Sequence, residues 1–274
     1  MNKTLPVAIQ LFTVWEEAER DLEGTLRELK AMGYDGVELA GMQGQTPEAL
    51  RELLEKTGLA VPSAHIGSRE LNENPEKAAE TYIAVGCRYI TISYIGRNNS
   101  PGQPGFAAAL ENIRKLCAYC GTRGVTVLYH NHDNEFMPME DGRIALEHIL
   151  DGVPDGGLQW QPDVCWVRVA GHDPVAYMRA HKGGIPMVHL KDYSLTGSAD
   201  RYMMSSLTKE EQGAPDVGFK FLPLGEGHQD FSSVLEASVA VGAQWVVVEQ
   251  DHSDDRPRIE AARMSREYLK SLGW

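Results

Sequence analysis

The sequence has no long apolar run and no excess of basic residues. Its longest apolar runs, Tyr89–Ile95 and Trp245–Val248, are strand-sized and fall well short of the ~20 residues that a membrane-spanning helix needs. The chain carries 26 Lys and Arg against 39 Asp and Glu, which gives a net charge of −13 at pH 7. Because this charge repels a phosphate backbone, we expect no nucleic-acid partner. We expect no membrane partner either.

Cysteine is scarce, and no secretion signal is visible. The four cysteines are Cys87, Cys117, Cys120 and Cys165. Cys117 and Cys120 match a C-x-x-C spacing, but without a second pair we expect them to be buried thiols on a helix. The N-terminal segment MNKTLPVAIQLF has one lysine and no small-residue cleavage site after an apolar stretch. We therefore expect a reducing, cytoplasmic location.

The 274 residues instead show one unit repeated about eight times: a short β-branched run, a polar turn and an amphipathic helix. Strict alternation of strand and helix predicts parallel strands with the helices outside. Eight units without a break predict an α/β protein, a single (β/α)8 TIM barrel over residues 1–274. An open, doubly wound sheet is the alternative.

The periodicity also predicts element bounds. Strands are expected at Val7–Val14, Gly36–Ala40, Ala60–Ile66, Tyr89–Ile95, Val125–His132, Gly157–Val167, Ile185–Tyr193 and Trp245–Asp251. Helices are expected near Leu22–Met32, Pro47–Lys56, Pro75–Val85, Phe106–Arg123, Arg143–Leu150, Pro174–Ala180, Phe231–Val241 and Arg256–Lys270.

One connection, at about residues 194–220, is far longer than the 2–6 residues of an ordinary loop between a strand and a helix. We expect this loop insertion to be a lid over the barrel mouth or a contact in a homo-oligomer. A decorative insertion is the alternative.

Polar and ionisable side chains gather at the expected strand ends, where a TIM barrel carries its functional residues. Such groups are costly to bury unless they are paired or bound to a metal. Imidazoles and carboxylates without thiolates suit one divalent metal ion, Mn²⁺, Co²⁺, Zn²⁺ or Mg²⁺. Asp163, His189 and Glu249 end three consecutive strands and are expected to bind it. The fourth ligand should come from the preceding strand end, where His130, His132 and Glu135 compete and His130 is our choice.

Several motifs together resemble the xylose isomerase-like TIM-barrel superfamily. They are His130-Asn131-His132-x-x-Glu135-Phe136, Gln161-Pro162-Asp163, Val188-His189-Leu190-Lys191-Asp192, Pro223-Leu224-Gly225-Glu226-Gly227 and Glu249. More narrowly, the chain resembles the sugar phosphate isomerase/epimerase group, whose relatives include ketose 3-epimerases and inosose dehydratases. In the ketose epimerases a Glu-Asp-His-Glu quartet holds a divalent metal. By resemblance, Asp163, His189 and Glu249 are its last three members, and His130 departs from the pattern at the first.

The resemblance implies a divalent-metal-dependent sugar isomerase or epimerase that acts through an enediolate on a keto-sugar or polyol. A keto-polyol dehydratase or lyase, like inosose dehydratase, would use the same metal and enolate and is the alternative. A non-catalytic sugar-binding barrel is another. We expect Glu249 to combine metal binding with proton transfer, and Glu135, ahead of His132, to act on the other face of the substrate. Lys191 would neutralise developing negative charge, and substrate contacts are expected from Gln10, Glu38, His65 and Trp166.

The sequence disfavours two further possibilities, a DNA-repair endonuclease activity and a phosphorylated substrate. The DNA-repair endonuclease branch of the same superfamily expects a histidine three residues after the aspartate, where this chain has Trp166. No Gly-rich loop with a following Lys-Ser/Thr is present, so we expect an unphosphorylated substrate. Lys191 and Arg97 are the nearest plausible partners for an anion.

Overall fold

Eight parallel strands form a nearly closed barrel in the computed structural model, which describes residues 4–153, 157–198 and 202–274. The strands are hydrogen-bonded in the order β6-β5-β4-β3-β2-β1-β10-β7. They span β1 (Val7–Gln10), β2 (Gly36–Ala40), β3 (Ser63–Ile66), β4 (Tyr89–Ile92), β5 (Thr126–His130), β6 (Leu158–Gln161), β7 (Met187–Leu190) and β10 (Trp245–Val248). The predicted fold class, a single (β/α)8 TIM barrel, is confirmed.

The seam of the barrel lies between β6 and β7, the two ends of this strand order. Among the described residues these strands share no continuous ladder, only a parallel bridge between Asp163 and His189. Backbone hydrogen bonds from His189 N to Pro162 O and from Trp160 N to Gly184 O, both 2.8 Å, support this bridge. The barrel is therefore closed at two of the expected metal ligands.

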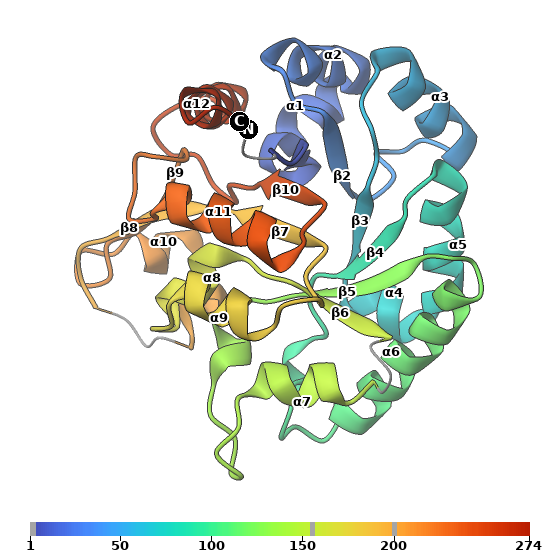
Figure 1. Cartoon of the computed structure of the whole chain (residues 1–274), viewed down its shortest axis with the longest axis vertical. Helices are drawn as coiled ribbons and strands as arrows, with labels where there is room; N and C mark the ends of the chain where they lie inside the picture. The colour runs from blue at the N-terminus through green and yellow to red at the C-terminus, as the bar shows by residue number, and fades with distance from the viewer. Residues whose placement is uncertain (1–3, 154–156, 199–201) are drawn as a thin grey trace.

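Helices surround the strands on the outside of the barrel (Figure 1). They are α1 (Trp15–Arg20), α2 (Leu22–Met32), α3 (Pro47–Thr57), α4 (Ser68–Glu73), α5 (Pro75–Val85), α6 (Phe106–Gly121), α7 (Ala145–Asp151), α8 (Val164–Val169), α9 (Pro174–Ala180), α10 (Lys209–Gln212), α11 (Phe231–Val241) and α12 (Arg258–Ser271). Local signals set many of these bounds. Thr46 Oγ1 caps α3 by accepting from Ala49 N at 3.3 Å, and Gly33 ends α2 with φ 97°. None of the described helices is long and apolar enough to cross a membrane.

The barrel interior changes from apolar to polar along the strands. An apolar cluster comprises Ala8, Tyr89, Leu128, Met187 and Val247. Alternate residues of a strand point to the same face, so the next inward positions lie two residues further along. These positions are polar and buried: Gln10, Thr91, His130, His189 and Glu249. The intervening residues, such as Ile9, Val188 and Val248, join the main apolar core.

The long connection differs from the loop expected at residues 194–220. Its two ends pair as an antiparallel hairpin, β8 (Asp192–Leu195) with β9 (Phe219–Leu222). An apolar cluster of Trp166, Tyr193, Met204, Phe219 and Phe221 lies at the base of this hairpin. Ser205 N, in the same connection, donates to both carboxylate oxygens of Asp133 at 3.2 Å. The connection is thus packed onto the barrel, although residues 199–201 lie outside the described part.

Candidate active site

Four side chains at the strand ends form a candidate metal site. One ligand atom from each lies within 4.8 Å of the others, and all four residues are buried: His130, Asp163, His189 and Glu249. His130 and His189 belong to β5 and β7, and Asp163 and Glu249 follow β6 and β10. Two nitrogen and two oxygen donors without a thiolate fit a divalent ion of the Mn²⁺, Co²⁺, Zn²⁺ or Mg²⁺ type. The structure thus brings together the four residues that the sequence analysis assigned.

Gln161 orients the His130 ring. The Gln161 amide nitrogen donates to Glu38 Oε2 at 2.8 Å, so its carbonyl oxygen faces His130 Nδ1 at 3.1 Å. Nδ1 must then carry the proton, which leaves the Nε2 lone pair for a ligand. Nε2 lies 3.7 Å from Asp163 Oδ2, toward the other donors. Burial and the neighbouring histidines hold the pKa of His130 well below its usual range, so the ring is neutral, as a metal ligand must be.

Asp163 divides its two carboxylate oxygens between two tasks. Oδ1 caps α8 by accepting from Cys165 N at 2.9 Å and Trp166 N at 3.3 Å. Oδ2 is buried and pairs with the Lys191 ammonium at 3.0 Å. Because Oδ2 takes no part in the helix cap, it is the oxygen that would bind a metal ion.

His189 lies between two carboxylates. Its Nε2 is 2.6 Å from Glu38 Oε1 and its Nδ1 is 3.0 Å from Glu249 Oε2. Burial opposes the charged ring, but Glu38 and Glu249 outweigh it and raise the pKa of His189 to about 10. Binding of an ion at Nδ1 would therefore release a proton.

Lys191 places a second cation in the cluster. Its ammonium lies 3.0 Å from Asp163 Oδ2, 2.9 Å from Glu249 Oε2 and 3.0 Å from Asp251 Oδ1, and the side chain is 1% exposed. Burial disfavours this charge, yet the carboxylates raise the pKa of Lys191 well above its usual range. With Glu38 included, the buried carboxylates outnumber Lys191 and protonated His189. The excess negative charge is a second reason why the cluster suits a divalent ion.

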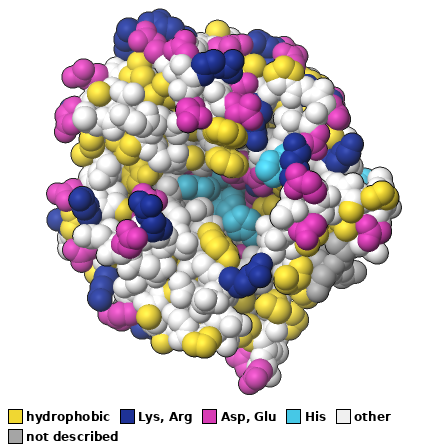
Figure 2. Space-filling view, turned by 180° about the vertical axis from the view of Figure 1, so that it is seen from behind, with side chains coloured by type: hydrophobic (Ala, Val, Ile, Leu, Met, Phe, Trp, Pro, Cys, Tyr) yellow, Lys and Arg dark blue, Asp and Glu magenta, His cyan; other side chains and the backbone are white. Residues whose placement is uncertain are grey.

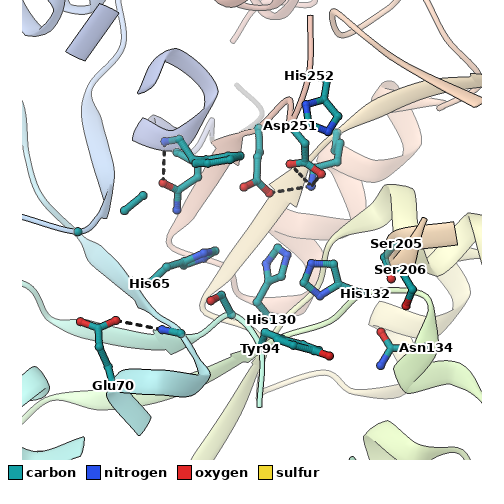
Figure 3. A pocket seen from close by; sticks show the side chains of 18 of the residues that line it. His65, Glu70, Tyr94, His130, His132, Asn134, Ser205, Ser206, Asp251 and His252 are labelled. Atoms are coloured by element: carbon teal, nitrogen blue, oxygen red, sulfur yellow. Dashed lines mark hydrogen bonds and ion pairs between the residues drawn. The ribbon is translucent and has the colours of Figure 1, made fainter. Parts of the chain in front are cut away.

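A cavity of about 660 Å³ opens above this cluster, within the range of small-molecule sites. Figure 2 shows it as a hollow in one face of the molecule, with histidine side chains gathered inside. His65, His130 and His132 lie side by side in Figure 3, with Asp251 and His252 across from them. Glu70 lies toward one end of the cavity, and Asn134, Ser205 and Ser206 lie toward the other.

Of the four residues expected to contact the substrate, two line the cavity and two do not. Gln10 and His65 line the cavity. Glu38 does not line it, because it is fully buried beneath and pairs with Gln10 Nε2 at 2.9 Å and His65 Nε2 at 2.9 Å. Trp166 does not line it either, and its ring stacks on Phe219 with centroids 5.8 Å apart. The expected strand over 157–167 was too long, since Asp163 starts α8 and so turns Trp166 toward the hairpin.

Glu135 and His132, the two candidates for the second face of the substrate, line different cavities. Glu135 accepts hydrogen bonds from Tyr129 Oη at 3.0 Å and His132 N at 2.7 Å, and it lines a smaller adjoining cavity of about 140 Å³. Burial raises the pKa of Glu135 to about 7. His132 lines the main cavity, and its Nδ1 is buried without a hydrogen bond to the described residues. The positions therefore favour His132 over Glu135 as a group that meets the substrate, the reverse of the expected ranking.

Sequence reasoning missed several cavity residues. Asp251 lies two residues after Glu249, and the alternation of a strand could have placed both on one side. Glu70 comes from α4, a helix that the periodicity did not predict. Ser205 and Ser206 come from the long connection and carry no local signal for a site.

Comparisons with known proteins agree with this architecture. The chain is 24% identical over 276 residues to the rhizopine catabolism protein MocC of Rhizobium meliloti, covering 92% of this chain and 81% of that protein. A sugar phosphate isomerase/epimerase from Parabacteroides distasonis has a similar structure, with 17% identity, a TM-score of 0.77 and coverage of 98% and 95% of the two chains. The probable 3-DHS dehydratase AsbF from Bacillus anthracis is similar too, at 16% identity, a TM-score of 0.71 and coverage of 97% and 99%. These structural likenesses show the fold alone. The family model of the xylose isomerase-like TIM barrel matches residues 26–272, and the chain belongs to this family.

Proposed function

We propose that the chain is a divalent-metal-dependent isomerase or epimerase that acts on a keto-sugar or related polyol. The observation that carries this proposal is the buried set of His130, Asp163, His189 and Glu249 at the floor of a sugar-sized cavity. The sugar phosphate isomerase/epimerase of similar structure supports the reaction class. A bound divalent ion would polarise the substrate carbonyl and stabilise the negative charge that develops on its oxygen.

The chain's own residues would move the proton at the carbon next to the carbonyl. Glu249 lines the cavity, and its contacts with His189 and Lys191 both use Oε2. Those charges hold the pKa of Glu249 well below its usual range despite its burial, so the carboxylate is ionised and able to accept a proton. Lys191 would offset the negative charge that forms on the substrate.

His132 is the candidate for the second face of the substrate. Burial and the Lys191 charge lower the pKa of His132 to about 3, so the imidazole is neutral and has a lone pair available. Its ring centroid lies 5.3 Å from that of His130, beside the metal cluster. In an epimerase this neutral imidazole would remove the proton from the second face of the substrate.

A dehydratase is the second candidate, and the position of Glu135 favours it. Because Glu135 is held by Tyr129 and the His132 backbone outside the main cavity, it is not placed to act as the second glutamate of the ketose epimerases. Elimination of water needs one base at the α-carbon and an acid at the departing oxygen. Glu249 and the Lys191 ammonium, 2.9 Å apart, are suited to these two tasks.

A screen of keto-sugars and inososes in D₂O tests both candidates. The purified protein is loaded with Mn²⁺, and mass spectrometry follows deuterium uptake and loss of water in parallel. Deuterium uptake with isomer formation is the expected result, and loss of water would assign the dehydratase. Asp163→Asn is the matched control because it keeps the oxygen that caps α8 and removes the charge. Sugar binding without any exchange would contradict an enzyme and indicate a binding protein.

A further inference from the structure

Arg97 is a cation at the cavity wall, and no described residue pairs with its guanidinium. Its side chain is exposed and lines both the main cavity and the smaller one beside it. It makes no ion pair or side-chain hydrogen bond with the described residues. By contrast, Lys191, which lines the same cavity, has three carboxylates within 3.0 Å. In a chain of net charge −13, a guanidinium at the site that no described carboxylate pairs with is conspicuous.

The carboxylates near Arg97 are already occupied. Glu135, which lines the smaller cavity, accepts from Tyr129 Oη, His132 N and Asn134 Nδ2. Glu70, which lines the main cavity, accepts from Gly67 N at 3.1 Å and Tyr82 Oη at 3.3 Å. Neither carboxylate forms an ion pair with Arg97 in the described part of the chain, so the guanidinium donors remain available to a ligand.

Hydrogen bonds and close contacts within the loop hold the backbone that carries Arg97. Gly96, just before it, has φ 95°, a conformation that favours glycine. Asn99 N donates to Gly96 O at 2.9 Å, and Gly105 N donates to Asn98 O at 3.0 Å. A Cβ on Gly105 would come within 2.7 Å of Asn98 O, so the loop closes tightly there. Arg97 is therefore presented from a fixed base, as a binding residue should be.

Neutral donors surround the position. Tyr94 and Ser206 line both cavities together with Arg97. The Tyr94 ring centroid lies 6.4 Å from that of His132, which in turn lies 5.3 Å from His130. A substrate at the metal cluster can thus extend past His132 to reach Arg97.

We propose that Arg97 binds a carboxylate carried by the substrate, so that the substrate is an acidic sugar or polyol derivative. This inference rests on the proposed function for the site but concerns binding alone. A guanidinium matches a carboxylate in a two-pronged geometry. Arg97 is the only Lys or Arg among the described residues that line the smaller cavity. A single guanidinium, beside neutral donors and the already hydrogen-bonded Glu135, suits the single charge of a carboxylate better than a phosphate dianion.

Calorimetric titration of the Mn²⁺-loaded full chain tests this directly. The probes are D-glucose, D-glucuronate and D-glucose 6-phosphate, with other aldohexose and uronate pairs as a panel. Wild type should bind a uronate at least about tenfold more tightly than its neutral partner, the usual value of a charged hydrogen bond. Arg97→Met should abolish that preference while leaving the affinity for the neutral sugar unchanged, and Arg97→Lys should restore part of it.

Arg69→Met is the matched control, because Arg69 is an exposed arginine that pairs with Glu73 away from the cavity. It should bind every probe as wild type does. Equal affinities for neutral and acidic sugars, or a loss of both in Arg97→Met, would overturn the inference. Arg97-dependent binding of the phosphate alone would overturn the carboxylate assignment. Because no turnover is measured, an inactive protein that still prefers uronates would contradict only the proposed reaction.

Discussion

Lys191→Met removes the cation that holds three carboxylates together at the floor of the site. Methionine has nearly the same length and no charge, so the substitution leaves little empty volume. Asp163, Glu249 and Asp251 then face one another without the ammonium that lies about 3 Å from each. The variant should be destabilised, and a divalent ion should compensate for much of the loss.

The magnitude follows from the burial of the group. Lys191 is 1% exposed and Asp163 is fully buried. Breaking a buried ion pair by removing one partner costs about 3–5 kcal/mol. For a chain of this size, that corresponds to a fall in Tm of roughly 6–20 °C. Mn²⁺ should raise the Tm of the variant more than that of wild type, because the ion no longer competes with an ammonium for Asp163 and Glu249.

Thermal unfolding after treatment with a chelator, and again with added Mn²⁺, measures both effects. Lys115→Met is the control, since Lys115 is exposed on α6 and makes no ion pair with the described residues. It should leave the Tm within about 1 °C of wild type. The reasoning is refuted if Lys191→Met unfolds at the wild-type temperature in chelator, or if Mn²⁺ stabilises the two proteins equally.

Three further outcomes are expected. Asp163→Asn should keep the cap of α8 but weaken Mn²⁺ binding by at least about 100-fold in calorimetry, because it removes a charged ligand. Burial raises the folded-state pKa of Glu135 from 4.5 to about 7, so the folded chain retains a proton that the unfolded chain releases. The free energy of unfolding, measured by urea titration, should therefore fall by about 3 kcal/mol as the pH rises from 4.5 to about 7. In Glu135→Gln this fall should be absent. Met204→Ala, at the base of the hairpin, should cost about 2–5 kcal/mol in the same titrations, whereas a decorative insertion would tolerate it.

Local and periodic features were predictable from the sequence. The bounds of α2 were predicted because Gly33 ends it, and those of α5 because Pro75 starts it. The convergence of His189 and Glu249 was predictable because the ends of parallel strands meet at one face of a barrel. These inferences needed only the spacing of residues along the chain.

Contacts between distant segments were not predictable in this way. Trp166 was expected at the cavity, but its position depends on the cap that Asp163 provides and on the hairpin that receives the ring. That hairpin pairs Asp192 with Leu222 across a long connection, and no local signal specifies such a pairing. Glu38 was expected to meet substrate, and only the folded structure shows its charge committed to buried partners.

The seam between β6 and β7 gives the candidate ligands a mechanical role. The strands meet through the bridge of Asp163 with His189. An ion bound by both side chains would therefore link β6 to β7 where the barrel is otherwise held by this bridge. Opening the barrel between β6 and β7 would then break the ion's bonds to these ligands and expose the apolar interior at the same time. Amide protons of β6 and β7 should therefore exchange with solvent much more slowly when the ion is bound, and the slowing should be largest at these two strands. Binding of the ion would then couple closure of the barrel to the assembly of the candidate active site.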